Sequence, residues 1–443
     1  MKKPHVVILG GGFGGLATAK SLRRAPVRVT LVDQSNHHLF QPLLYQVATS
    51  ALTAPDIAAP LRKLLRKQEN TQVLMARAVS IDPDARVVRL DQGELEYDYL
   101  VLATGMVNNY FGHPEWEAHA PGLKTLREAL DVRSRVLRAY EAAERETDPE
   151  RRKELLTFVL IGAGPTGVEM AGALREIAAE TLAADFRTFD ADKDVRVVLL
   201  EGTDRVLPAM HPESSRDALT SLKELGVEVH LETFAESVDA HGVCTADGMR
   251  IQAATVVWAA GLKASPLTEG LGAERDRAGR VKVEPDLTVP GRPEVYVLGD
   301  LISLEQDGEP LPGVAQTAIQ SGRFAAEQID AEVQDLPKRA RFVYKDKGSM
   351  ATIGRARAVA EVSSSRFSGF FAWMLWLVIH ILFLVDFRNR IAVLMEWAYA
   401  YVTWRRSARV ILDAPSRHRP ALERDAILRS ELTRSSERPA ATD

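Results

Sequence analysis

Short apolar runs alternate with stretches of helical periodicity over the first 300 residues. Residues 6–9 form an apolar run, residues 16–22 follow helical spacing, and residues 27–32 have the pattern of a second strand. Short runs bounded by turn residues are typical of buried parallel strands, and the helical stretch between them completes a βαβ unit. This order predicts an α/β fold.

The same order recurs about 150 residues later. Residues 157–161 form a mostly apolar, strand-like run, a helical pattern extends to about residue 179, and residues 195–200 have the pattern of the next strand. Two further runs, 99–103 and 255–260, end in the turns Thr104-Gly105 and Gly261. The two halves therefore predict a duplicated nucleotide-binding fold, with residues 116–155 forming a helix that links the halves.

A glycine-rich turn lies between strand and helix in each half. The glycines are Gly10, Gly12 and Gly15 in the first turn and Gly162, Gly164 and Gly167 in the second. Such turns let backbone N–H groups approach a pyrophosphate, and the helix that follows adds its positive N-terminal end. Two dinucleotides are therefore predicted. The alternative is a structural α/β protein with two chance glycine turns.

An acidic residue follows the second strand of each unit, where a carboxylate can accept hydrogen bonds from ribose hydroxyls. These residues are Asp33 and Glu201. A carboxylate at the second site also repels the 2′-phosphate of NADP, so NAD(H) is favoured there.

Residues 295–300 form a third strand-like run that ends at Asp300. A Gly-Asp pair after a strand is common in ordinary turns. After two dinucleotide motifs, however, it predicts that the chain has returned to the first domain, where Asp300 can accept hydrogen bonds from a flavin ribityl chain. The second nucleotide unit is then inserted in the first.

Composition excludes several classes of protein. The net charge of −4 predicts that the protein has no nucleic-acid partner. Cys244 is the only cysteine, which excludes disulfides, thiolate metal sites and dithiol redox chemistry within one chain. No metal site is predicted, and the apolar stretch after the N-terminus is too short for a secretory signal.

The C-terminal part of the chain is patterned for a membrane surface. Residues 370–385 form an apolar run with His380 as the strongly polar member, and Trp397, Tyr401 and Trp404 follow at helical spacing before Arg405, Arg406 and Arg409. Aromatic residues prefer the headgroup level and arginines meet anionic lipid there. Monotopic docking is predicted, with a spanning helix near 370–385 or ordinary core helices as alternatives. His380 can be either functional or structural.

Four segments together resemble the type II NADH:quinone oxidoreductases, within the flavoproteins that have two dinucleotide-binding domains. These segments are HLFQPLLYQVA at 38–48, GPTGVE at 164–169, AQTAIQ at 315–320 and DKGSMATIG at 346–354. The resemblance implies that the first glycine turn holds FAD and the second holds NADH. It also implies that Glu169 lies near flavin and nicotinamide and that Gln316 and Gln320 border a quinone. It adds Gln41, Thr104, Gly105, Asp300, Gln316 and Gly261 to the cofactor-binding residues.

The predicted protein is a peripheral membrane flavoenzyme with two Rossmann-like domains. We expect an FAD-binding domain at 1–115 and 280–335, an NADH-binding domain at 156–279, a helical membrane-anchoring region at 336–412 and a mobile tail at 413–443. The enzyme would oxidise NADH and reduce ubiquinone or menaquinone without pumping protons, on the cytoplasmic face of the cell membrane. A homodimer is possible.

Other functions share parts of this pattern. A sulfide:quinone reductase or a disulfide reductase needs a cysteine pair, which Cys244 cannot supply. A soluble NADH oxidase or diaphorase needs no apolar C-terminal segment. A non-catalytic redox sensor would bind nucleotides without turnover, although Asp33, Glu201 and the two glutamines favour an enzyme.

Overall fold

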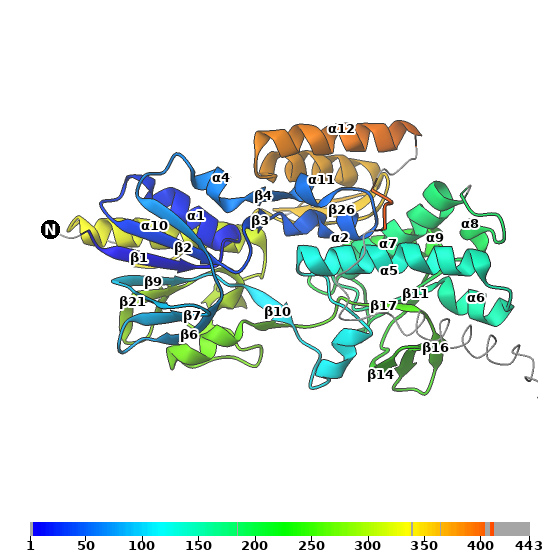
Figure 1. The fold of residues 1–443 in the computed structure, drawn as a ribbon, viewed down its shortest axis with the longest axis horizontal. Helices are drawn as coiled ribbons and strands as arrows, with labels where there is room; N and C mark the ends of the chain where they lie inside the picture. The colour runs from blue at the N-terminus through cyan, green and yellow to red at the C-terminus, as the bar shows by residue number, and fades with distance from the viewer. Residues whose placement is uncertain (1–2, 184, 338–339, 364, 404–407, 412–443) are drawn as a thin grey trace, which may run out of the picture.

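The computed structural model describes residues 3–183, 185–337, 340–363, 365–403 and 408–411. Its largest sheet has six strands in the order β20-β21-β9-β1-β2-β5. The strands are β1 (His5–Leu9), β2 (Arg28–Asp33), β5 (Thr71–Met75), β9 (Tyr99–Leu102), β20 (Thr288–Val289) and β21 (Arg292–Val297). All neighbours in this sheet are parallel except β20 and β21. Helices α1 (Phe13–Ser21) and α10 (Ala315–Val333) lie together beside this sheet (Figure 1).

A second, four-stranded parallel sheet has the order β13-β12-β11-β17. Its strands are β11 (Thr157–Ile161), β12 (Arg196–Leu200), β13 (Val227–His230) and β17 (Thr255–Trp258), with helices α7 (Pro165–Glu176), α8 (Ala191–Asp194) and α9 (Pro212–Glu224). Because β21 pairs with β9 only after this sheet is complete, the second unit is inserted in the first. The predicted α/β fold class is confirmed.

The two units are joined by an antiparallel pair, β10 (Met106–Asn108) with β18 (Leu262–Ala264), in the middle of the molecule (Figure 1). The single linking helix expected at 116–155 is wrong. Residues in this stretch form α5 (Leu126–Arg145) and α6 (Pro149–Leu155), because the Asp148 side chain caps a new helix whose first residue is proline. Helix α5 also buries one face, including Val136 and Tyr140, in the core.

The C-terminal region differs from the expected all-helical anchor. It begins with an antiparallel sheet of β25 (Ser349–Gly354), β26 (Arg357–Val362) and β27 (Ser365–Ser368), followed by α11 (Gly369–Phe383) and α12 (Phe387–Thr403). Strand β25 lies directly on α7, where a Cβ at Gly172 would fall 1.6 Å from the Ile353 carbonyl oxygen. Strand pairing and packing on α7 therefore decide the structure of residues that carry no strong local pattern.

Helix α12 is fastened to the first unit at its N-terminal end. The buried Asn389 side chain donates from Nδ2 to the carbonyl oxygens of Pro55 and Ala58, at 3.1 and 3.3 Å. Pro55 belongs to α3 (Ala54–Ile57) and Ala58 begins β4 (Ala58–Pro60). The C-terminal region thus contacts both nucleotide units.

The remaining elements are short. They are β3 (His37–Leu39), α2 (Leu44–Ala48), α4 (Leu61–Leu65), β6 (Ala78–Asp82), β7 (Val87–Leu90), β8 (Glu94–Glu96), β14 (Ala235–Asp239), β15 (Gly242–Thr245), β16 (Arg250–Gln252), β19 (Val281–Lys282), β22 (Ile302–Ser303), β23 (Glu305–Gln306) and β24 (Glu309–Pro310), with 3-10 turns and one π-helix (Ile177–Leu182) between them.

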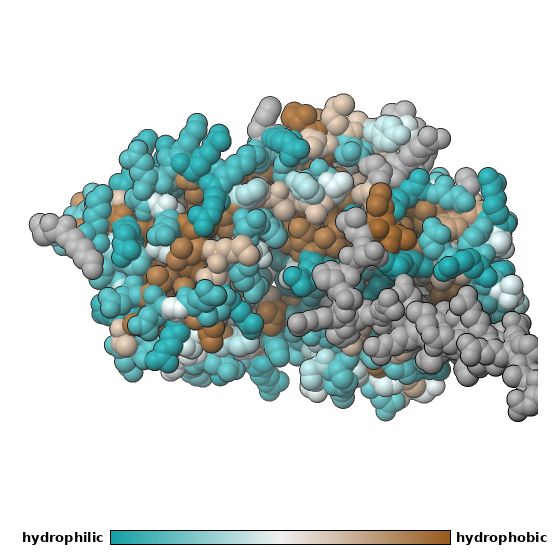
Figure 2. Space-filling model, viewed as in Figure 1, coloured by the Kyte–Doolittle hydropathy of each residue, from teal (hydrophilic) through white to brown (hydrophobic). Residues whose placement is uncertain are grey.

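Helices α11 and α12 expose many large apolar side chains, which we call the apolar face. Figure 2 shows part of it over α12, at the top of the molecule. Its residues are Phe370, Phe371, Met374, Val378, Leu382, Phe383, Ile391, Leu394, Met395 and Tyr399. In the part of the chain that is described, no helix combines the length and apolarity needed to cross a membrane. The alternative of a span near 370–385 is therefore not supported, since α11 has 15 residues.

The predicted orientation of the aromatic stripe is wrong. Trp397 is buried against Trp376, and Tyr401 packs on Trp373, so both rings face the protein. Arg409 forms an ion pair with Asp185, whereas the expectation was a contact with lipid. Trp404, Arg405, Arg406 and the expected tail at 413–443 lie outside the described residues.

Candidate nucleotide sites and a buried carboxylate

The first glycine turn has a shape that only glycines allow. Gly10 has φ +102°, and a Cβ there would lie 2.4 Å from the Ala103 carbonyl oxygen. A Cβ at Gly15 would lie 1.9 Å from the Gly10 carbonyl oxygen, so helix α1 starts in close contact with the turn. At Gly12, in contrast, a Cβ would meet no protein atom within 4 Å. The protein leaves space at Gly12, where the turn gives way to the helix.

The second turn repeats this arrangement. Gly162 has φ +103° and Gly167 would place a Cβ 1.9 Å from the Gly162 carbonyl oxygen, while Gly164 again faces open space. Gly12 and Gly164 are the N-cap residues of α1 and α7, and neither has a side chain to satisfy the first helical amides. Open space above free amides at a helix N-terminus suits a pyrophosphate.

Each predicted acid lies beside its own turn. Asp33 accepts hydrogen bonds from the amides of Gly11 and Ser35, both at 2.6 Å. Glu201 accepts from the Ala163 amide at 2.6 Å and from the Thr203 amide at 2.9 Å. Burial raises the pKa of Asp33, and the two backbone hydrogen bonds oppose that rise. Each carboxylate therefore fixes the turn and keeps further lone pairs for a ribose.

Two buried polar atoms at the first turn lack partners among the described residues: the Thr104 hydroxyl oxygen and Nε2 of His38. His38 Nδ1 lies 3.0 Å from the Gly11 carbonyl oxygen, and burial lowers the pKa of His38 to about 4. The ring is therefore neutral at neutral pH, donates to Gly11, and leaves Nε2 as an acceptor. Buried polar atoms normally have partners, so both atoms fit a cofactor at this turn.

Asp300 and Gln41 lie near a lysine that the sequence patterns did not single out. Gly299 and Asp300 begin a 3-10 turn after β21, and a Cβ at Gly313 would lie 3.8 Å from a carboxylate oxygen of Asp300. Gln41 donates to the Lys124 carbonyl oxygen at 3.1 Å. Burial lowers the pKa of Lys124, and the negative charge of Asp300 opposes that shift. No local pattern marks Lys124, because its surroundings come from segments far apart in sequence.

The two glycines at the strand ends differ in their surroundings. Gly105 has φ +66° and faces open space. Gly261 has φ +70°, and a Cβ there would lie 2.4 Å from the Phe111 ring. Gly105 therefore leaves room for a ligand beside Thr104, whereas Gly261 allows close packing between the units.

The two glutamines of α10 have different environments. Helix α10 packs on α1 so closely that a Cβ at Gly322 would lie 2.4 Å from the Gly14 carbonyl oxygen, which holds its N-terminal end beside the first turn. Gln320 donates to the Lys345 carbonyl oxygen at 2.9 Å and accepts from the Lys345 amide at 3.0 Å. Its amide is therefore already engaged in fixing the chain at Lys345. Gln316, one turn nearer the helix start, is half-buried.

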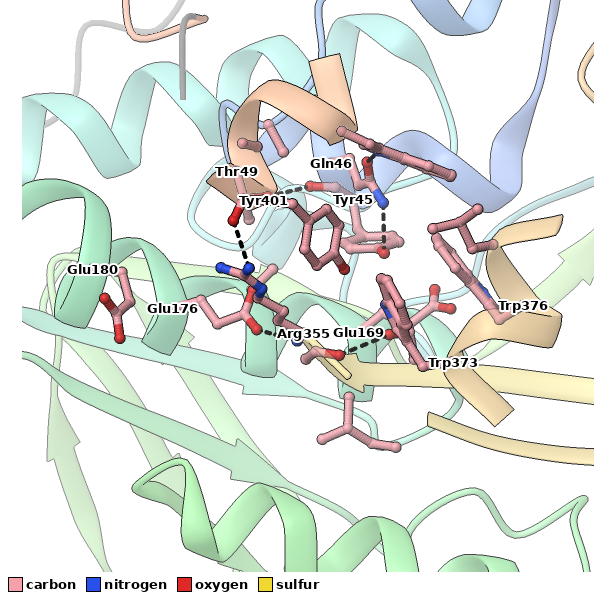
Figure 3. Close-up of a pocket in the computed structure, with 18 of the residues that line it drawn as sticks. Tyr45, Gln46, Thr49, Glu169, Glu176, Glu180, Arg355, Trp373, Trp376 and Tyr401 are labelled. Carbon is pink, nitrogen blue, oxygen red and sulfur yellow. Dashed lines mark hydrogen bonds between the residues drawn. The ribbon is translucent and has the colours of Figure 1, made fainter. Parts of the chain in front are cut away.

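Glu169 lies in a separate pocket between α7 and the C-terminal helices (Figure 3). Its side chain is buried, with 9% exposure. Burial raises the pKa of Glu169 well above its ordinary value, although the Thr352 amide hydrogen-bonds to it. Burial therefore favours the protonated form of Glu169. Residues that line the pocket include Tyr45, Gln46, Glu176, Glu180, Thr352, Arg355, Trp373, Trp376, Trp397 and Tyr401 but neither Gln316 nor Gln320.

His380 has a structural environment. Its Nδ1 lies 2.7 Å from the Trp376 carbonyl oxygen, and its ring stacks on the Trp376 indole at 4.3 Å. Burial lowers the pKa of His380 to about 4, so the ring is neutral. Of the two readings of this residue, the structure favours a hydrogen-bonded packing role.

Comparisons with known proteins agree with this geometry. Residues 4–322 match the pyridine nucleotide-disulphide oxidoreductase family, and residues 347–406 match the NDH2 C-terminal domain. Type II NADH:quinone oxidoreductase Ndh of Mycobacterium tuberculosis is 43% identical, over 98% of this chain and 96% of its own length. Type II NADH:quinone oxidoreductase NdhA of the same organism is 47% identical, over 90% of this chain and 87% of its own length.

The chain belongs to the type II NADH:quinone oxidoreductase family. Among solved structures, NDH2 from Plasmodium falciparum in complex with NADH has the same fold, with a TM-score of 0.84 at 19% identity. That match covers 93% of this chain and all of the other. The family resemblance inferred from the four sequence segments is confirmed, and the disulfide reductase and redox-sensor alternatives lose their support.

Proposed function

We propose that this chain oxidises NADH and transfers two electrons to a membrane quinone, yielding quinol. The observation that carries the proposal is the matched pair of glycine turns. In each turn, the first and last glycines pack so closely on backbone that no Cβ would fit, while the middle glycine, Gly12 or Gly164, faces empty space. A carboxylate hydrogen-bonds to each turn. Membership of the type II NADH:quinone oxidoreductase family supports the same conclusion.

FAD fits the first turn, where it would be held by the amides after Gly12, the carboxylates of Asp33 and Asp300, and the Thr104 hydroxyl, which has no partner among the described residues. Bound there, FAD supplies the two-electron redox chemistry that amino-acid side chains lack. The residues around it would orient the ring and exclude water. Neutral His38 offers Nε2 as an acceptor without adding charge.

NADH would bind at the second turn, with its pyrophosphate above Gly164 and its ribose hydroxyls on Glu201. Glu201 already accepts two backbone hydrogen bonds, so its orientation is fixed before the nucleotide arrives. The negative charge of Glu201 disfavours a 2′-phosphate, and the enzyme should prefer NADH to NADPH.

The quinone would meet the amide of Gln316 at the N-terminal end of α10. Gln320 supports this site indirectly, because it holds the chain at Lys345. Glu169, whose protonated form is favoured by burial, would supply a proton to the reduced quinone. An amide can donate to a quinone carbonyl and accept from a quinol hydroxyl, so Gln316 suits both redox states.

The apolar face on α11 and α12 would rest in the bilayer surface, on the cytoplasmic side, and admit a quinone with an isoprenoid tail. Phe371 and Met395 are 76% and 66% exposed, which is unfavourable in water. Burial of this face against a second copy of the chain is the competing outcome. Flotation with vesicles and sedimentation in detergent distinguish the two.

The visible spectrum of the purified protein tests the function. A flavin absorption band should be present, should bleach with NADH under anaerobic conditions, and should return when a quinone is added. Absence of the band, or a bleached band that quinone does not restore, would contradict the proposed function.

A further inference from the structure

The proposed reaction requires one proton from water in each turnover. NADH gives up two electrons and one proton in becoming NAD+, while the quinone takes two electrons and two protons in becoming quinol. A buried acid such as Glu169 can deliver the missing proton once, but it must then be protonated again. The inference below rests on the proposed function and concerns how that proton arrives.

Three glutamates line the Glu169 pocket in a row along one helix. Glu169 is buried in α7, Glu176 ends α7 and is half-buried, and Glu180 is exposed in the π-helix that follows. Spacings of seven and eleven residues keep them on one side of the helix. Figure 3 shows Glu180, Glu176 and Glu169 in this order across the pocket. The burial of the three side chains thus increases stepwise from Glu180 at the solvent to Glu169 in the interior.

The distance excludes direct proton transfer. Eleven residues at about 1.5 Å each separate Glu169 from Glu180 by roughly 16 Å along the helix axis. The pocket between them has a volume of about 110 Å3. One water needs roughly 10–15 Å3 of such space, so a short chain of waters fits. Sites for drug-sized ligands are larger and measure roughly 300–1,000 Å3.

The surroundings of the pocket are polar on the side of α7 and aromatic on the side of α11 and α12. Arg355, in the turn after β25, donates its amide to the Glu176 carboxylate and lies 4.4 Å from the centre of the Tyr401 ring. Two tyrosines also line the pocket, Tyr401 of α12 and Tyr45 of α2. The Tyr45 hydroxyl accepts a hydrogen bond from Gln46 at 2.9 Å. Burial raises the pKa of Tyr45, so this tyrosine stays neutral.

The π-helix at Ile177–Leu182 adds an independent observation. Such wider turns are rare and often occur at functional sites, because they redirect side chains that an α-helix would aim elsewhere. Here the π-helix carries Glu180 and Thr181 to the mouth of the pocket. Its place, directly after Glu176, is where a route from solvent would begin.

We propose that this pocket is a water-filled proton route in which Glu180 and Glu176 pass protons to Glu169. Each turnover moves one proton inward from bulk water, and no charge crosses the membrane by this route. Glu180 and Glu176 do not touch the quinone; they act only by returning a proton to Glu169. Arg355 keeps the Glu176 carboxylate directed into the pocket.

Isosteric variants test the route. Glu176→Gln and Glu180→Gln keep the side-chain shape, and glutamine at position 176 still accepts from the Arg355 amide. In stopped-flow experiments, flavin bleaching by NADH should keep its wild-type rate. Reoxidation by quinone should slow by about one order of magnitude, and the deficit should grow between about pH 6 and pH 9. A small weak acid such as formic acid should restore the rate in Glu180→Gln.

Glu141→Gln provides the matched control, since Glu141 is an exposed helical glutamate that does not line this pocket. It should reoxidise as wild type at every pH. Unchanged reoxidation in both pocket variants, or slowing that is independent of pH and unrelieved by formic acid, overturns the proton route. Wild-type protein that fails to reoxidise with quinone overturns the proposed function instead, so the two failures are distinguishable.

Discussion

The indole Nε1 of Trp397 donates a hydrogen bond to Oε1 of Gln46 over 2.8 Å, across 351 residues of sequence. Gln46 in turn donates from Nε2 to the hydroxyl of Tyr45. One short network therefore links α12, which carries part of the apolar face, to the wall of the Glu169 pocket. Hydrogen bonds in such networks reinforce one another, so they help to hold α12 against the pocket wall.

Replacing Phe371 and Met395 with glutamate should weaken membrane binding. Both side chains are largely exposed on the apolar face, and burying a charge in lipid is unfavourable by several kcal/mol. Flotation with liposomes should show most of the double variant in the soluble fraction. Val79→Glu, at another exposed apolar residue on β6, should float as wild type. Equal flotation of both proteins would remove the case for docking through α11 and α12.

Gly12→Val and Gly164→Val should separate the two nucleotide sites. Neither new Cβ meets a protein atom within 4 Å, so both variants should fold. Gly12→Val should purify without flavin, because its side chain fills the space for the first pyrophosphate. Gly164→Val should retain flavin, lose bleaching by NADH and still bleach with dithionite. A fully loaded, yellow Gly12→Val protein would contradict the assignment.

Glu201→Gln should narrow the preference for NADH over NADPH by about tenfold, or roughly 1.4 kcal/mol. The substitution removes the negative charge that disfavours a 2′-phosphate. The new side-chain NH2 group is a donor and cannot accept from the backbone amides of Ala163 and Thr203 as the carboxylate oxygen did. The second turn should therefore be held less well, which should raise the KM for NADH. Steady-state kinetics with both nucleotides measure the effect. Equal use of the two nucleotides by the wild type would contradict the role of Glu201.

Gln316→Ala and Gln320→Ala should both slow reoxidation by quinone and spare reduction by NADH. Losing one hydrogen bond to quinone at Gln316 predicts a slowing of roughly two- to twelvefold, from 0.5–1.5 kcal/mol. Gln320→Ala should also lower the melting temperature, because the two hydrogen bonds between the Gln320 side chain and the Lys345 backbone are lost. If either variant slowed the NADH step alone, its place at the quinone side would be wrong.

Glu169 should make stability depend on pH. Burial raises its pKa in the folded state above the ordinary 4.5, so its contribution to stability is fully present below about pH 4.5. That contribution is lost as pH rises through the folded pKa. Glu169→Gln cannot ionise, so its melting temperature relative to wild type should increase with pH in this window. A difference that stays constant with pH would show that Glu169 is not a buried, protonated acid.

Local patterns predict the nucleotide units well. Strand, glycine turn and helix follow one another along the chain in each unit. Asp33 ends the next strand of the first unit, and Glu201 directly follows the next strand of the second. The constraint on Gly15 and Gly167 comes from the backbone of their own turns, so local sequence identifies both. The return of the chain at Asp300 was likewise readable, because β21 has the pattern of a buried parallel strand.

The C-terminal region and the buried carboxylate could not be predicted in the same way. The side of α12 that carries Trp397 faces inward because Gln46 and Trp376 offer partners there, and both lie outside its own segment. The engagement of Gln320 with Lys345 is also a tertiary contact. Periodicity reports that a helix has two faces, whereas the partners of each face depend on the whole fold.

Gly172 limits how the parts of this chain can be exchanged with those of relatives. Any side chain at this position would strike the Ile353 carbonyl, so α7 and β25 meet with no room for a single methyl group. A chimaera that joins the C-terminal region of one family member to the nucleotide units of another must keep this close contact between α7 and β25. The three parts of the chain are therefore not independent modules, and substitutions on either side of this contact must be compatible with the other.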